Sequence, residues 1–289
     1  MNNATTTQRV REFLEGPLTR PALRKWRLRQ FLSREGFTAY FGVFDSFADA
    51  RRWLPESPGF GKEELAREFV DVRCRRLYEY DYPVLWWLAS ALRSGARRVL
   101  DIGGSVGVHY YAYSRYLEMP PDLRWQIVEV PMIVSLGQGL AAEKGASALD
   151  FSTDLRASLA DTDADLWLSA GTLQYMEDAR PGDLLGRCAA RPAHILLNKL
   201  PLYEGEDFVT AQNIGYDCFA PVQVFNRDRL IGEVEARGYV LRDTWAVHER
   251  SLYLPGFPER SLPSFSGLYF TARTKMPDRS HAAEAKEPQ

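Results

Sequence analysis

The strongest constraint on the fold is a glycine-rich turn between a predicted strand and a predicted helix. Residues 99–107 read VLDIGGSVG. The apolar run predicts a buried strand over 98–102, and the following residues predict a helix over about 107–117. A turn of this kind is typical of sheets that are built from strand–helix–strand units. Such sheets bind ligands at the carboxyl ends of their strands, so we expect a ligand at this turn.

The rest of the chain continues the alternation of strands and helices. Segment 200–217, after the fifth strand, is expected to be a long loop that carries substrate contacts. The alternation predicts the α/β class, with a Rossmann-like, seven-stranded, mostly parallel sheet, helices on both faces and an antiparallel last hairpin. Further strands are predicted over 124–130, 148–151, 165–169, 193–198, 239–245 and 266–273, and helices over 133–144 and 225–237.

Three zones are expected along the chain. Residues 1–95 are predicted to form a helical lid or cap, since 63–78 and 82–92 have apolar residues at helical spacing. Residues 96–275 are predicted to form the ligand-binding domain, and 276–289 a disordered tail without an apolar face. The basic segment 20–34 is expected to be a helix packed on its own domain, with a membrane-surface helix as the alternative.

Composition excludes several classes of protein. The 289 residues are 45% hydrophobic, and 36 basic and 38 acidic residues give a net charge of −2, so no nucleic-acid partner is expected. Neither a membrane-spanning run nor the apolar core of a signal peptide is present, which predicts a cytoplasmic protein without stable membrane anchoring. Cys74, Cys188 and Cys218 form no CxxC pair, so neither a disulfide framework nor a metal site is expected. A homo-oligomer is left open.

The residues of the turn point to a cationic ligand. Gly103 and Gly104 allow a tight turn and close approach, and Gly107 lets the helix begin against the strand. A dinucleotide fingerprint requires glycine where this chain has Ser105. Asp101 would repel a pyrophosphate, but it suits the sulfonium and amino groups of S-adenosylmethionine. We therefore expect these five residues to bind that donor, with S-adenosylhomocysteine as product; a glycine turn without a ligand is the alternative.

Two later strand ends offer further donor contacts. Glu129 ends the second strand, where an acidic residue of nucleotide-binding sheets accepts the ribose hydroxyls, and Val130 follows it. Asp150 can accept from the adenine amino group, and Phe151 can pack on the ring. The alternative for this second pair is a helix cap, because Ser152 and the next two residues are good capping residues.

The loop after the fourth strand is expected at the same edge. Its small residues Ser169, Ala170 and Gly171 would let the methionine end of the donor and the acceptor approach each other. Gln174 and Tyr175 are the candidates to face the transferred methyl group. The alternative is a helix start with Tyr175 in the core.

The candidate catalytic residues are His109, Tyr175 and His248. A histidine has a pKa near neutrality and suits proton removal from a weakly acidic hydroxyl. His109 lies just past the glycine turn, and His248 follows the sixth predicted strand. A structural role for each histidine is the alternative, since methylation of an amine or an activated carbon needs only positioning.

Three stretches resemble a known family. They are 42–55 with 82–92, then 99–117 (VLDIGGSVGVHYYAYSRYL) with 125–138, and LQYMED at 173–178 with VFNRDRL at 224–230. The chain is similar there to uncharacterised class I methyltransferases of bacterial polysaccharide and secondary-metabolite pathways. The resemblance implies the seven-stranded fold and a methyl donor held, by position, at Asp101, Gly103, Gly107 and Glu129. At Asn198, this chain departs from the family's usual acidic–basic pair before proline, so no role is carried over.

The sequence therefore predicts methyl transfer from S-adenosylmethionine to a small-molecule acceptor, such as a natural-product or saccharide intermediate. Two alternatives stay open. An NAD(P)-dependent oxidoreductase is disfavoured by Ser105 in the turn. A non-catalytic S-adenosylmethionine-binding scaffold subunit is the other, because no general base stands out.

Overall fold

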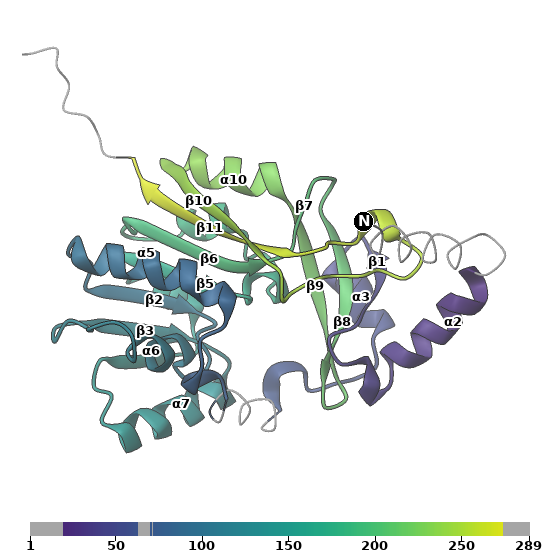
Figure 1. Ribbon diagram of the computed structural model, residues 1–289, viewed down its shortest axis with the longest axis horizontal. Helices are drawn as coiled ribbons and strands as arrows, with labels where there is room; N and C mark the ends of the chain where they lie inside the picture. The colour runs from purple at the N-terminus through teal and green to yellow at the C-terminus, as the bar shows by residue number, and fades with distance from the viewer. Residues whose placement is uncertain (1–19, 63–69, 71, 274–289) are drawn as a thin grey trace, which may run out of the picture.

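The computed structural model describes residues 20–62, 70 and 72–273. Its main sheet has the order β10-β11-β6-β5-β2-β3-β4 (Figure 1). The five strands β6, β5, β2, β3 and β4 are parallel to one another, and β11 is antiparallel to both β6 and β10. The predicted Rossmann-like sheet, seven-stranded and mostly parallel with an antiparallel last hairpin, is thus confirmed. The strands are β2 (Arg98–Ile102), β3 (Arg124–Val128), β4 (Leu149–Ser152), β5 (Leu166–Ala170), β6 (His194–Leu200), β10 (Tyr239–Val247) and β11 (Phe265–Ala272).

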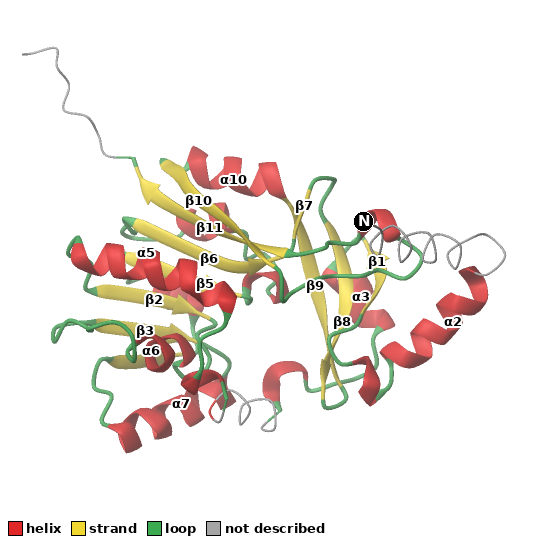
Figure 2. Cartoon of the chain, viewed as in Figure 1, coloured by secondary structure: helices red, strands yellow, loops and turns green. Residues whose placement is uncertain are grey.

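Helices cover both faces of the main sheet. Successive side chains of a strand point to opposite faces, so the apolar strands need a covering layer on each side. Leu100 of β2 and Trp167 of β5 pack in one core with α9 and α10, while Val99 and Leu166 pack in the other with α5 and α6. Figure 2 shows the helices in red and the strands of the sheet in yellow. This alternation confirms helices on both faces. The helices are α5 (Tyr82–Arg93), α6 (Val108–Tyr113), α7 (Pro131–Lys144), α8 (Leu155–Ala160), α9 (Pro181–Gly186) and α10 (Arg227–Ala236).

A second sheet of four strands lies beside the first (Figure 1), with the order β1-β8-β9-β7. Its strands are β1 (Tyr40–Phe44), β7 (Leu202–Tyr203), β8 (Phe208–Gly215) and β9 (Cys218–Asn226). The prediction of a long loop over 200–217 is therefore wrong. Every residue of β8 is buried, including three polar ones, so the sequence lacks the alternation of a half-exposed strand.

The N-terminal region contributes a strand to this second sheet as well as helices. Helix α2 (Arg20–Phe31) and helix α3 (Phe47–Trp53) flank β1, which pairs antiparallel with β8. Phe31 of α2 packs on Phe41 and Phe219 of the small sheet, with its ring centroid 5.8 Å and 5.4 Å from theirs. Helix α2 therefore packs on the small sheet. Half of the helix predicted over 63–78, and the tail over 276–289, lie outside the described residues. Within 72–78 the structure has only a short 3-10 helix, Arg73–Arg75. No helix in the described ranges is long and apolar enough to cross a membrane.

Candidate active site

The glycine turn after β2 is tightly packed. Gly103 has φ +76°, and a Cβ there would lie 1.9 Å from Thr172 Oγ1 in the loop after β5. Gly107, the residue before α6, has φ +99°, and Ser105 has φ +55°. A Cβ at Gly104 would lie 2.4 Å from Asp101 Oδ2. The turn thus bends closely over Asp101 and against the neighbouring loop, which only glycine permits at Gly103.

Replacing Gly103 with alanine is expected to lower the free energy of unfolding by about 2 kcal/mol or more. The left-handed backbone strains an alanine, and its Cβ would also clash with the Thr172 side chain. The matched control is Gly139→Ala on an exposed turn of α7, where a Cβ would meet nothing within 4 Å. That change is expected to stabilise by about 0.5–1 kcal/mol, since alanine favours helix over glycine. Urea denaturation of both variants measures the two effects. Equal stability of the two would contradict the packing at Gly103.

Asp101 lies beneath the turn, fully buried, and is a positioning residue. Its Oδ2 is 2.9 Å from His109 Nδ1 and accepts a hydrogen bond from Trp125 Nε1 at 3.2 Å. Asp101 is absent from the described linings of the two cavities at this edge. Asp101 therefore does not line either cavity, and its carboxylate holds the underside of the turn through His109 and Trp125; a direct contact with the donor stays a prediction.

A cavity of about 470 Å³ opens where the carboxyl edge of the main sheet faces the small sheet. Eight of its lining residues belong to the set that was predicted from the sequence. The cavity brings together Gly103, Ser105, Glu129, Val130, Ala170, Gly171, Gln174 and Tyr175 among the predicted residues. The small sheet supplies the opposite wall with Tyr40, Gln212 and Ile214. The predicted ligand edge is thus a real concavity.

Glu129 is held in a fixed orientation at this cavity. Its Oε1 accepts a hydrogen bond from the Ser105 backbone N–H at 3.2 Å, and its Oε2 accepts from the Val130 N–H at 2.9 Å. Burial raises the pKa of the Glu129 carboxyl; these two N–H groups lower it by less, and the nearby charge of Asp101 adds to the rise. Each carboxylate oxygen keeps a lone pair for a ligand hydroxyl.

Two buried polar atoms at the cavity lack a partner. Ser105 Oγ and Gln174 Oε1 have no hydrogen-bond partner within the described part of the chain. Both residues line the cavity. Buried polar atoms without partners cost folding free energy, so their presence here indicates a polar ligand.

Two predicted adenine contacts lie elsewhere. Asp150 is exposed on β4, and Phe151 packs beneath α7, where a Cβ on Gly137 would lie 2.4 Å from its ring. The cavity is lined instead by Thr153 and Leu155, a few residues further on. The strand runs to Ser152, one residue beyond the predicted end, so the chain reaches the cavity later than expected.

The other predicted residues have structural or supporting positions. The Ser169 hydroxyl donates to the Ile102 carbonyl at 2.9 Å and ties β5 to β2. His248 is exposed, and the described linings of both cavities lack it, so the structure does not bring this candidate base to the site. Tyr175 donates to Gln212 Oε1 at 2.6 Å. Burial raises the pKa of Tyr175 to about 12, so its hydroxyl stays protonated as a donor.

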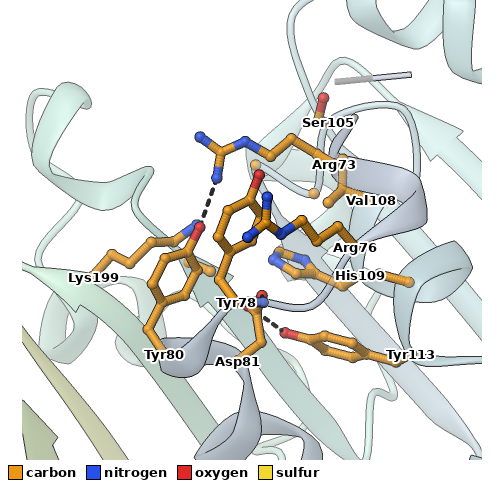
Figure 3. Close-up of a pocket in the computed structure, with 14 residues that line it drawn as sticks. Arg73, Arg76, Tyr78, Tyr80, Asp81, Ser105, Val108, His109, Tyr113 and Lys199 are labelled. Carbon is orange, nitrogen blue, oxygen red and sulfur yellow. Dashed lines mark hydrogen bonds between the residues drawn. The ribbon is translucent and has the colours of Figure 1, made fainter. Parts of the chain in front are cut away.

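A smaller cavity adjoins the large one (Figure 3) and mixes both signs of charge. Arg73 Nη1 donates to the Tyr80 hydroxyl at 2.6 Å, and the Tyr113 hydroxyl donates to Asp81 Oδ1 at 3.1 Å. The rings of Tyr78 and Tyr80 stack with centroids 5.3 Å apart. His109 and Gly104 line this cavity. Five residues line both cavities, which are therefore continuous: Arg73, Gly103, Ser105, Ala170 and Lys199.

Lys199, Arg73, Asp81 and Arg250 are site residues to which the sequence assigned no role. Lys199 follows Asn198 in β6, with φ +57° and Nζ 5.1 Å from the centre of the Tyr80 ring. Burial lowers the pKa of Lys199 to about 8; Asp81 opposes that shift. One signal was available for Lys199, because it lies near the carboxyl end of a predicted parallel strand.

No family model and no curated protein matches the chain. Solved structures resemble its fold: the N-terminal domain of EvdMO1 with S-adenosylhomocysteine bound is 18% identical, with 78% of this chain and 95% of that one covered and a TM-score of 0.45. The 1,6-didemethyltoxoflavin N1-methyltransferase of Burkholderia thailandensis is 17% identical, with 76% and 92% covered and a TM-score of 0.44. The amino pentose methyltransferase CalS10 of Micromonospora echinaspora is 13% identical, with 73% and 96% covered and a TM-score of 0.44.

Proposed function

We propose that the chain transfers a methyl group from S-adenosylmethionine to a small-molecule acceptor in the 470 Å³ cavity. One observation carries the proposal. The Glu129 carboxylate is fixed at the end of β3, beside the glycine turn, with capacity for two ligand hydroxyls. The vicinal hydroxyls of a ribose fit such a carboxylate.

The chain's residues suit the parts of this donor. Glu129 would hold the ribose, and Thr153 and Leu155 would lie beside the adenine. The smaller cavity suits an α-amino acid, since Arg73 can bind a carboxylate and Asp81 an ammonium group. When bound, the donor supplies an electrophilic methyl group on a sulfonium. The chain aligns that group with the acceptor, and the small sheet excludes water from them.

The dinucleotide alternative is disfavoured by the turn itself. In a dinucleotide site, the backbone N–H groups of the turn bind the pyrophosphate. Here the Ser105 N–H donates to Glu129, so a phosphate at that position would meet a carboxylate. The sheet also inserts the antiparallel β11 where a dinucleotide-binding sheet continues in parallel.

The scaffold alternative is disfavoured by the second wall of the cavity. A subunit that only bound the donor would need the main-sheet residues alone. Tyr40, Gln212 and Ile214 add a wall from the small sheet, which gives an acceptor a place beside the donor. We infer a donor-binding domain over 96–275 with an N-terminal lid over 1–95. A cytoplasmic location and a lack of nucleic-acid partners stay predictions from the sequence, and a homo-oligomer stays open.

Calorimetric titration with S-adenosylhomocysteine tests the function, with NADH as the competing ligand. We expect S-adenosylhomocysteine to bind and NADH not to bind. Transfer of labelled methyl groups from S-adenosylmethionine to a metabolite extract then tests turnover. No binding of S-adenosylhomocysteine would overturn the proposal, and binding without any labelled product would favour the scaffold alternative.

Donor affinity is expected to fall as the pH is lowered. The ionised form of Glu129 accepts the ribose hydroxyls, and burial raises the pKa of this carboxyl. The loss therefore begins at a higher pH than for an ordinary glutamate. Folding stability changes in the opposite sense, because the charged buried form is the costly one above that raised pKa. Calorimetry with S-adenosylhomocysteine from about pH 8 to about pH 5 checks this, and a constant affinity would contradict it.

A further inference from the structure

The large cavity carries an excess of positive charge. Among the described residues that line it, three are cationic, Arg73, Lys199 and Arg250, and one is a carboxylate, Glu129. On the proposed function, Glu129 and Arg73 serve the donor. Lys199 and Arg250 are then two cations without an assigned ligand.

Lys199 reaches the place where donor and acceptor would meet. Its side chain passes Gly171, at which a Cβ would lie 3.3 Å from Lys199 Cε. Gly171 belongs to the loop after β5, beside the glycine turn. Within residues 20–62, 70 and 72–273, no carboxylate forms an ion pair with Lys199. Figure 3 shows its ammonium group beside Tyr80.

Arg250 lines the same cavity and is fixed there by its backbone. Its N–H donates to the Val247 carbonyl at 3.2 Å, and its carbonyl accepts from the Phe265 N–H at 2.9 Å. These bonds join the end of β10 to the start of β11. Its guanidinium likewise forms no ion pair with a carboxylate of the described chain. Ser266, which follows Phe265 in β11, pairs with Leu200, which follows Lys199 in β6, so both cations reach the cavity from adjacent strand ends. The charge of Arg250 also lowers the pKa of Lys199.

Two half-buried cations that repel each other are costly unless an anion joins them. Asp81 partly offsets the effect of burial on Lys199, but on the proposed function it binds the ammonium group of the donor. The tyrosines of this wall cannot supply the anion, because burial raises the pKa of Tyr40 and Tyr175 and keeps both phenols neutral. Phe60 and Phe265 add apolar surface beside them. The wall therefore suits a ligand with an apolar or aromatic body and an acidic group.

We propose that the methyl acceptor is an organic acid, whose anionic group binds between Lys199 and Arg250 while its apolar body packs on Phe60, Tyr175 and Phe265. This inference rests on the proposed function and specifies its substrate class. A carboxylate and a phosphate ester share the required chemistry, since both accept charge-assisted hydrogen bonds from these cations.

The test uses the full chain saturated with S-adenosylhomocysteine. It is titrated with 4-hydroxybenzoate, cinnamate and phenyl phosphate, and with the neutral 4-hydroxybenzamide and cinnamamide. We expect at least one acid to bind, about tenfold or more tighter than its amide, because a charge-assisted pair is lost in the amide. The carboxylates and the phosphate ester show which acidic group fits.

Variants assign the effect to the two cations. Arg250→Gln and Lys199→Gln are each expected to weaken acid binding about tenfold. Arg250→Lys keeps the charge and is expected to retain part of the affinity. It therefore distinguishes the loss of charge from misfolding of the glutamine variant. Arg242→Gln, at an exposed position of β10, is the matched control without effect.

The outcomes separate the two proposals. Equal binding of acids and amides, no binding of any acid, or full acid affinity in Arg250→Gln would each overturn the organic-acid inference while S-adenosylhomocysteine still binds. Failure of the wild type to bind S-adenosylhomocysteine would overturn the methyltransferase proposal itself.

Discussion

Replacing Glu129 with alanine is expected to weaken S-adenosylhomocysteine binding about a hundredfold. The reason is the loss of two hydrogen bonds from ribose hydroxyls to a charged acceptor, each worth about 1.5 kcal/mol or more. The variant also removes the anchor of the Ser105 N–H, which holds the turn beside the ribose. Calorimetry at neutral pH measures the change.

Controls separate binding from folding in this experiment. Glu129→Gln keeps the shape but turns one acceptor into a donor that faces the Val130 N–H, so an intermediate loss of about tenfold is expected. Glu143→Gln, on the exposed face of α7, is expected to have no effect. The melting temperature of Glu129→Gln should not fall, because burial raises the pKa of Glu129 and makes its charge costly. Unchanged affinity in Glu129→Ala would refute the ribose assignment.

Replacing Asp101 with alanine is expected to destabilise the fold by about 3 kcal/mol. Two buried donors, His109 Nδ1 and Trp125 Nε1, would lose their common acceptor, at about 1–3 kcal/mol each. The melting temperature should fall by roughly 6–12 °C. Differential scanning calorimetry measures this change. Well below the melting temperature, the variant should still bind S-adenosylhomocysteine, with an affinity lowered only by the weaker support of the glycine turn.

The companions of this variant test the positioning role directly. Asp101→Asn keeps one acceptor oxygen, so it should recover part of the lost stability. Asp122→Asn, whose carboxylate is exposed, should leave the melting temperature unchanged. A stable Asp101→Ala protein that no longer binds S-adenosylhomocysteine would instead support the direct contact expected from the sequence.

Most of the main sheet could be predicted because its signals are local. The Gly turn, the apolar runs of β2 and β5, and the helix end at Gly145 each depend on a few adjacent residues. Strand ends at the carboxyl edge then place Glu129 and the loop after β5 together by topology alone. For this reason, Gly103, Ser105, Ala170, Gly171 and Gln174 were found from the sequence.

The small sheet could not be predicted because its signals are not local. Thr210, Gln212 and Asn213 are buried polar residues in one strand, a pattern that resembles a loop. Their partners come from far along the chain: Thr210 Oγ1 donates to the Gly42 carbonyl at 2.7 Å, and Asn213 Nδ2 to the Phe31 carbonyl at 2.6 Å. Only the folded chain shows that these polar groups are satisfied.

The second half of the site was missed for the same reason. Arg250 and Lys199 face one cavity only because β10 and β6 are brought near through β11. One of the two candidate histidines, His248, is exposed, while Arg250, two residues later, lines the cavity. The residue types suggest candidates, but the path of the backbone determines which of them line the cavity.

The pairing of β1 with β8 affects how the protein is made. Tyr40 pairs with Gln212, so the first strand leaves the ribosome long before its partner has been synthesised. Contacts of such large sequence separation form late, since a long loop must close first. The main sheet can therefore assemble its donor side while the acceptor wall is still incomplete.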